Sequence, residues 1–122
     1  MTQPKAVVID DDVALGGLFQ ATLEMCGFSV RHITDSSTAI AQVNNQLPDL
    51  IVLDMQMPRV SGLEVARSLR ANPVTAKIPI MMVTANAQTT RDQAIDELVD
   101  VLLIKPITAS QIIDFARRLT GS

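Results

Sequence analysis

Five short apolar runs constrain the fold of this 122-residue chain more than any other feature. Each has three to six residues, too few for a helix, and four of them are continuous, as strands buried on both faces are. One, 28–33, alternates apolar and polar residues, which is typical of an edge strand with one solvated face. The runs cover residues 6–9, 28–33, 51–53, 79–83 and 101–104.

Stretches with helical periodicity separate these runs, so five predicted strands alternate with five predicted helices. Connections of that length join parallel strands through right-handed crossovers and place helices on both faces of the sheet. The sequence therefore predicts an α/β fold, a doubly wound five-stranded parallel sheet. We expect a single domain over residues 1–122, with its core between about residue 5 and about residue 119.

Several predicted helices carry capping signals at their first turns. Ser61 is followed three residues later by Glu64, and Thr108 by Gln111, which is the spacing of a capping box. Asp12 is expected to cap or to precede the first helix, where a negative charge suits the helix dipole.

Adjacent glycines, Gly16 and Gly17, lie inside the first predicted helix. Each costs about 1 kcal/mol relative to alanine, which either a close approach by another group or simple tolerance would explain. His32 lies on the polar side of the strand 28–33 and is expected to be a surface residue. Residues expected to face the core are Leu15, Leu18, Phe19, Leu23 and Cys26 in the first helix, and Ala94, Ile95 and Leu98 in a helix that begins near residues 89–90.

The composition excludes several classes of protein. Hydrophobic residues make up 48% of the chain, and with no Trp, no Tyr and three Phe the core must be aliphatic. The formal net charge is -3 without a basic cluster, which disfavours direct binding of nucleic acid. A single cysteine allows no internal disulfide, residues 1–5 lack the basic and apolar regions of a signal peptide, and no apolar run reaches the ~20 residues that span a bilayer. We expect a cytoplasmic protein without membrane contact.

Polar residues that have no role in a core follow four of the five predicted strands. They are Asp10-Asp11, Asp54, Thr84 and Lys105. Because parallel strands end at the same edge of a sheet, these side chains are expected to converge on one site. The carboxylates suit a hard divalent cation, and an ammonium and a hydroxyl beside them suit an anion. This combination is what phosphoryl transfer requires, with Asp54 as the candidate nucleophile.

This set of residues resembles the receiver domains of two-component response regulators, the CheY-like fold. The motifs that carry the resemblance are Asp10-Asp11, the loop 54–58 (Asp-Met-Gln-Met-Pro), Gly62, Thr84-Ala85 and Lys105-Pro106. The resemblance extends over residues 5–119 and implies a flavodoxin-like strand order of 2-1-3-4-5. It also implies that Asp54 accepts a phosphoryl group from a phosphohistidine on a sensor histidine kinase or a histidine phosphotransfer protein.

The resemblance further assigns a role to each site residue. Mg²⁺ would be held by Asp11, Asp54 and the backbone carbonyl of Gln56, with Asp10 acting mainly through water. The residue at the position of Gln56 also tunes how fast the acyl phosphate hydrolyses in this family.

Three further positions would handle the phosphoryl group. Lys105 would pair with its oxygens, and the Thr84 hydroxyl would move onto it, assisted by the Ala85 amide. The Lys105–Pro106 peptide is typically cis in the family. Such a domain is a phosphoacceptor in signalling and not a turnover enzyme, because its chemistry is limited to its own phosphorylation and dephosphorylation.

The sequence departs from the family's pattern at Leu102. An aromatic side chain that moves with Thr84 is usual there, and Leu102 would have to replace it by a simpler movement. The run 98–104 is apolar apart from Asp100, so we expect it to form an apolar patch. We therefore expect the face made by the fourth helix, the strand 101–104 and the fifth helix to bind an effector or a second copy of the chain.

Three alternative functions compete with this one. A receiver-like interaction module that phosphorylation does not switch is the main alternative, and Leu102 favours it weakly. A phosphatase with an aspartyl nucleophile would need a second acid at position 56, where Gln56 cannot serve. A flavodoxin-like cofactor binder would need a phosphate-binding loop after the first strand, where three aspartates, 10–12, would repel phosphate.

Overall fold

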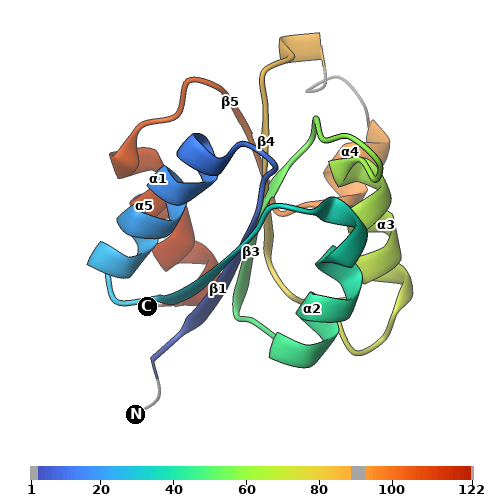
Figure 1. The fold of residues 1–122 in the computed structure, drawn as a ribbon, viewed down its shortest axis with the longest axis horizontal. Coiled ribbons are helices and arrows are strands. Elements are labelled where there is room, and N and C mark those ends of the chain that lie inside the picture. The colour runs from blue at the N-terminus through green and yellow to red at the C-terminus, as the bar shows by residue number, and fades with distance from the viewer. Residues whose placement is uncertain (1–2, 89–92, 122) are drawn as a thin grey trace.

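The computed structural model describes residues 3–88 and 93–121 and shows a five-stranded sheet flanked by helices (Figure 1). The strand order is β2-β1-β3-β4-β5, and every neighbouring pair is parallel. This confirms the predicted fold class, the strand order and the edge position of the strand at 28–33. The strands are β1 (Lys5–Ile9), β2 (Ser29–Ile33), β3 (Leu50–Asp54), β4 (Ile80–Thr84) and β5 (Val101–Ile104).

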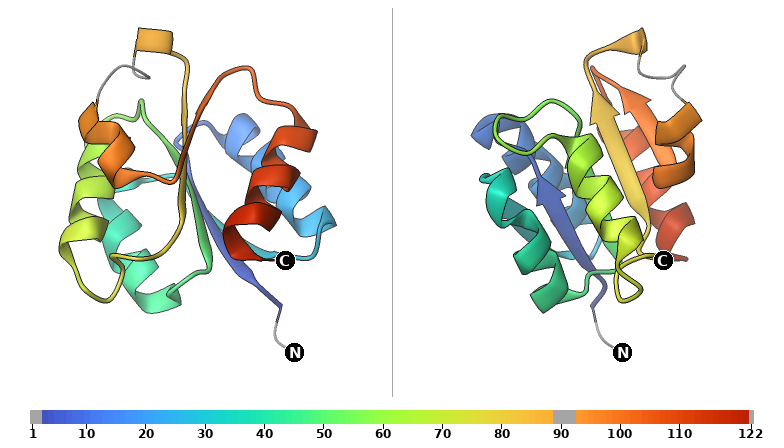
Figure 2. Two further views of the ribbon diagram at one scale, coloured as in Figure 1. Left: turned by 180° about the vertical axis from the view of Figure 1, so that it is seen from behind. Right: turned by 90° about the vertical axis from the view of Figure 1, so that its right-hand side faces the viewer.

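Of the five α-helices that the structure describes, two cover one face of the sheet and three cover the other, and Figures 1 and 2 show this arrangement. The first pair is α1 (Val13–Met25) and α5 (Ala109–Thr120). The opposite face carries α2 (Ala39–Gln46), α3 (Gly62–Ala71) and α4 (Gln93–Leu98), and a short 3-10 turn, η1 (Ser36–Thr38), precedes α2.

The central strands β3 and β4 are apolar up to their last residues, Asp54 and Thr84, because both of their faces are covered. All residues of β3 and β4 are buried, whereas the edge strand β2 exposes alternate side chains. In β3, Ile51 and Leu53 pack toward α2 and α3, while Leu50 and Val52 pack toward α1 and α5. The core is therefore two layers, one on each face of the sheet, and they are aliphatic except for Phe19 and Phe28 on the α1 and α5 side.

Side-chain caps are present at the three predicted helix starts, and α5 is the one of these three for which both halves of a capping box are formed. The Asp12 carboxylate accepts from the Leu15 N–H at 3.0 Å, and the Ser61 hydroxyl accepts from the Glu64 N–H at 3.2 Å. At α5, Thr108 and Gln111 form both halves of a capping box. Asp12 thus acts as a helix cap and is separate in role from the two aspartates that precede it.

Arg70 ties the end of α3 to the segments that flank β4 and β5. Its guanidinium donates to the carbonyls of Leu98, Ala76 and Ile78 at 2.7–2.9 Å and to the Asp100 carboxylate at 3.0 Å. The side chain is only 18% exposed. Sequence pattern alone indicates a basic residue in the last turn of a helix, but not that it binds three carbonyls.

Two residues expected in the core lie on the surface instead. Leu18 is 59% exposed, because Phe19 and Leu23 already fill the side of α1 that faces the sheet. Ala94 is exposed because the described part of α4 is short and contacts the core chiefly through Ile95, with Leu98 half-buried. The predicted start of this helix, near residues 89–90, lies outside the described residues.

No helix in the described part of the chain is long and apolar enough to cross a membrane.

Candidate functional site

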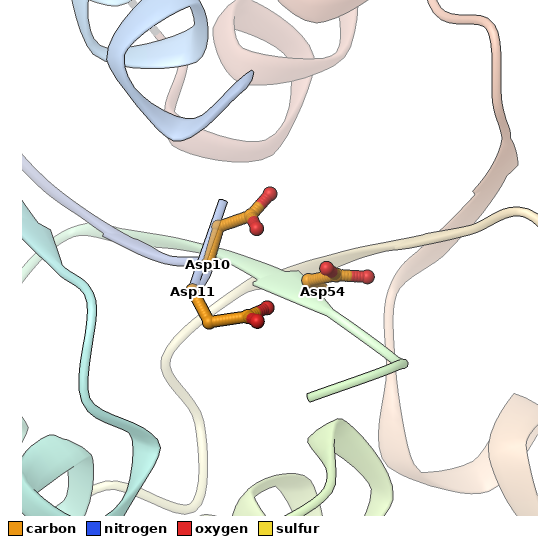
Figure 3. Close-up of side chains that lie close together, drawn as sticks. All are labelled: Asp10, Asp11 and Asp54. Carbon is orange, nitrogen blue, oxygen red and sulfur yellow. The ribbon is translucent and has the colours of Figure 1, made fainter. Parts of the chain in front are cut away.

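Three carboxylates meet where β1 and β3 end. Asp10 and Asp11 directly follow β1, and Asp54 is the last residue of β3. The pairing of Ile9 with Leu53 brings these strand ends side by side. One oxygen from each carboxylate lies within 4.8 Å of the other two, and Figure 3 shows the three groups gathered at this edge. The predicted convergence of Asp10, Asp11 and Asp54 is therefore observed.

Asp10 is buried, and the hydrogen bonds of its carboxylate do not fully compensate for the loss of contact with water. It is 1% exposed, and one of its oxygens accepts from the Asp12 N–H at 2.9 Å. The other oxygen, Oδ2, is buried and has no hydrogen-bond partner among the described residues. Burial raises the pKa of Asp10 to about 6, and the charge of Asp54 adds to this, against the opposing effects of the Asp12 N–H and Lys105.

These observations fit a hard divalent cation. A buried carboxylate oxygen without a hydrogen-bond donor, next to two further carboxylates, is costly unless a cation joins them. Magnesium is bound by oxygen ligands and retains several waters, which the exposed position of Asp11 accommodates. The donor set is therefore chemically suited to Mg²⁺.

Lys105 supplies the positive charge at this edge. Its Nζ lies 3.4 Å from Asp54 Oδ1, and the two side chains are 23% and 4% exposed. The Lys105 N–H also donates to the Thr84 carbonyl at 2.7 Å, which holds the end of β5 against β4. The Lys105–Pro106 peptide is cis, as the resemblance to receiver domains implied.

The side chain of Gln56 bridges the two groups expected to hold a phosphoryl group. Its Nε2 donates to Thr84 Oγ1 at 2.8 Å, and its Oε1 accepts from the Ala85 N–H at 3.3 Å. The backbone N–H of Gln56 donates to Asp54 Oδ1 at 3.2 Å. Sequence reasoning assigned Gln56 a backbone role and a place beside the site, but it missed these side-chain contacts, because they depend on the alignment of β3 with β4.

Gly62 allows the loop after β3 to close over Asp54. Its N–H donates to the Met55 carbonyl at 3.0 Å, and a Cβ at this position would overlap the Asp54 carbonyl and the Met55 Cα. Only glycine fits so close a backbone approach without a shift. Gly62 therefore belongs to the support of the site as well as to α3.

His32 was expected to be an ordinary surface residue, and that prediction is wrong. It is half-buried, and its Nε2 lies 2.8 Å from the backbone carbonyl of Asp10. Its ring lies against Gly16 in α1, where an added Cβ would overlap it, while a Cβ at Gly17 would meet nothing within 4 Å. The close approach of the His32 ring therefore explains the glycine at position 16, but it does not explain the glycine at position 17.

The strand β5 is less exposed than the sequence suggested. Leu102 is half-buried and packs on the same core layer as Ile95 of α4. Ile104, at 41% exposure, is the large apolar residue of the run 98–104 that faces solvent. The expected apolar patch on this strand is therefore small.

Comparisons with known proteins agree with this geometry. The family model described as "Response regulator receiver domain" matches residues 6–117. The chain is 36% identical over 117 residues to the DNA-binding dual master transcriptional regulator RpaA of Synechocystis, covering 95% of this chain and 48% of that protein. It is 36% identical over 110 residues to the phosphate regulon transcriptional regulatory protein PhoB of Rhizobium meliloti, covering 89% and 48%.

The fold has a close structural counterpart as well. The crystal structure of a putative response regulator from Chloroflexus aurantiacus superposes with a TM-score of 0.90 at 22% identity, covering 99% of this chain and all of that one. The chain spans about half the length of each of the two curated relatives named above. On the match to the family model, which covers nearly all of its length, the chain belongs to the receiver domain family of response regulators.

Proposed function

We propose that this domain is a phosphorylation switch in which Asp54 accepts a phosphoryl group from a phosphohistidine on a sensor histidine kinase or a histidine phosphotransfer protein. An Asp54 oxygen would form the new bond to phosphorus while the bond from phosphorus to the imidazole nitrogen breaks, leaving its electron pair on that nitrogen. The observation that carries the proposal is the position of Asp54, which lies between two further carboxylates and the Lys105 ammonium.

Magnesium is the cofactor that this arrangement supports. Asp11, Asp54 and the backbone carbonyl of Gln56 would hold it, with Asp10 acting through water. The ion would neutralise charge on the phosphoryl oxygens, which carry most of the negative charge during transfer. Lys105 would serve the same purpose from the other side, since its ammonium already lies within 3.4 Å of Asp54.

Gln56 would have to release Thr84 and Ala85 when Asp54 is phosphorylated. Its carboxamide holds the hydroxyl and the N–H that the phosphoryl oxygens would otherwise engage. We propose that this exchange of partners accompanies phosphorylation, and that Leu102 follows Thr84 in place of the usual aromatic side chain. The α4, β5 and α5 face would then bind an effector or a second copy.

Helix α1 carries an exposed apolar face that would suit the docking of the phosphodonor. Exposed residues of this helix fall on one face that is apolar except for Glu24, and Val13, Leu18 and Met25 are 59–88% exposed. The helix starts at the Asp12 cap, directly beside Asp10 and Asp11. We propose that the donor protein binds this face, in the cytoplasm, and that the domain itself turns over no other substrate.

Incubation with acetyl phosphate and Mg²⁺ tests the proposal. Mass spectrometry should show the gain of one phosphoryl group, which is lost in Asp54→Asn and retained in Asp114→Asn, an exposed carboxylate on α5. No mass gain in the unchanged protein, or a gain that survives Asp54→Asn, would instead support the alternative of an interaction module that is not switched by phosphorylation.

A further inference from the structure

His32 connects three elements around the acidic site. It lies on β2, its ring occupies the space left by Gly16 in the first turns of α1, and its Nε2 lies 2.8 Å from the carbonyl of Asp10. A carbonyl oxygen can only accept, so Nε2 carries the hydrogen in this contact. The Asp10 N–H donates to the Ile33 carbonyl at 3.0 Å. Both backbone groups of Asp10 are therefore held by neighbouring residues of β2.

The carbonyl that His32 binds belongs to the peptide that links Asp10 to Asp11. Because the peptide unit is planar, the orientation of this peptide fixes the N–Cα bond of Asp11, from which the Asp11 side chain starts. It lies just beyond the last paired residue of β1, Ile9, where the strand ladder no longer restrains it. A hydrogen bond from outside the strand is thus what restrains this peptide.

We propose that His32 is a positioning residue for the metal site, which rests on the proposed function. By donating to the Asp10 carbonyl it orients the Asp10–Asp11 peptide, and with it the two carboxylates that follow β1. Gly16 is required because any side chain there would displace the imidazole. The glycine that the sequence left unexplained is, on this view, part of the support of the acidic cluster.

Four substitutions separate this role from a general effect on folding. Glutamine at position 32 carries its Nε2 as many bonds from the backbone as histidine does, so His32→Gln retains a donor that reaches the carbonyl, whereas His32→Asn falls one bond short. Gly16→Ala displaces the ring, and Gly17→Ala is its matched control in the same helix with free space around the new Cβ.

Mg²⁺ affinity by isothermal titration calorimetry is the main measurement. We expect His32→Asn and Gly16→Ala to bind Mg²⁺ about tenfold more weakly, the lower end of the loss seen when partners that orient metal ligands are removed. We expect His32→Gln and Gly17→Ala to bind close to the unchanged protein. In ¹H–¹⁵N spectra, the Nε2–H resonance of His32 should be protected from exchange in the unchanged protein and in Gly17→Ala, and should lose protection in Gly16→Ala.

Several results would overturn the proposal. Unchanged Mg²⁺ affinity in a folded His32→Asn protein would do so, as would equal losses in His32→Gln and His32→Asn, since the donated hydrogen would then be irrelevant. His32→Asn keeps the test decisive if Gly16→Ala does not fold. A chain that binds no Mg²⁺ in any form would overturn the proposed function as well, whereas equal binding in all forms would overturn this inference alone.

Discussion

Replacement of Asp10 by asparagine should stabilise the metal-free protein. Burial raises the pKa of Asp10 from its ordinary 3.8 to about 6. The folded state therefore binds a proton at Asp10 more tightly than the unfolded chain does. The contribution of this protonation to the free energy of unfolding is fully present below pH 3.8 and is lost as the pH rises through about 6. Asparagine has nearly the same shape, still accepts from the Asp12 N–H, and carries no charge to bury.

The expected gain follows from the size of the pKa change. At about 1.4 kcal/mol per pKa unit, the difference between 3.8 and about 6 corresponds to about 3 kcal/mol at a pH of about 7.5. At a pH of about 4.5 the Asp10 carboxyl is largely protonated in the folded state, and the same relation gives Asp10→Asn an expected gain in stability of about 1 kcal/mol. The free energy of unfolding of Asp10→Asn should therefore exceed that of the unchanged protein by an amount that grows with pH.

Urea unfolding in the presence of a chelator measures this difference. Far-ultraviolet circular dichroism is the suitable signal, because the chain has no Trp and no Tyr. Asp114→Asn, an exposed carboxylate on α5, is the control and should show no comparable pH dependence. Excess Mg²⁺ should reduce the difference in free energy of unfolding between Asp10→Asn and the unchanged protein, since it stabilises the protein that retains all three carboxylates. An asparagine variant that is no more stable at a pH of about 7.5, or whose advantage does not shrink on acidification, would refute this reasoning.

Three further substitutions probe other contacts. Gln56→Ala removes the carboxamide that holds Thr84 and should speed phosphorylation by acetyl phosphate, followed by mass spectrometry; a slower reaction would contradict the exchange of partners proposed above. Arg70→Met keeps the apolar stem but loses four hydrogen bonds, so it should lower the free energy of unfolding in urea by about 3 kcal/mol, and a loss below about 1 kcal/mol would show that the bonds add little. Leu18→Ser should slow phosphoryl transfer from a phosphorylated kinase and leave the reaction with acetyl phosphate unchanged. The control Val74→Ser, which is similarly exposed but distant from α1, should change the rate of neither reaction. Equal rates of transfer from the kinase to the two variants would argue against docking on α1.

The amino-acid sequence by itself determined the layout of this protein. Short apolar runs separated by helical stretches leave a parallel sheet as the architecture, and in a parallel sheet all strands end at one edge. That is why Asp10, Asp11, Asp54, Thr84 and Lys105, scattered along the chain, were predicted to lie at one edge of the sheet, which is where the structure places them. The caps at Asp12 and Thr108 are equally local, since each depends on residues a few positions apart.

Tertiary structure alone decided which groups from distant parts of the chain the other polar side chains touch. Periodicity places His32 on the polar side of an edge strand, but the group opposite that side comes from α1 and from the end of β1. In the same way, the contact of Gln56 with Thr84 depends on how β3 and β4 are aligned. Leu18 follows an apolar pattern and is still exposed, because a helix buries only the side that its neighbours cover. A local pattern specifies a face, whereas the partner on that face is supplied by distant parts of the chain.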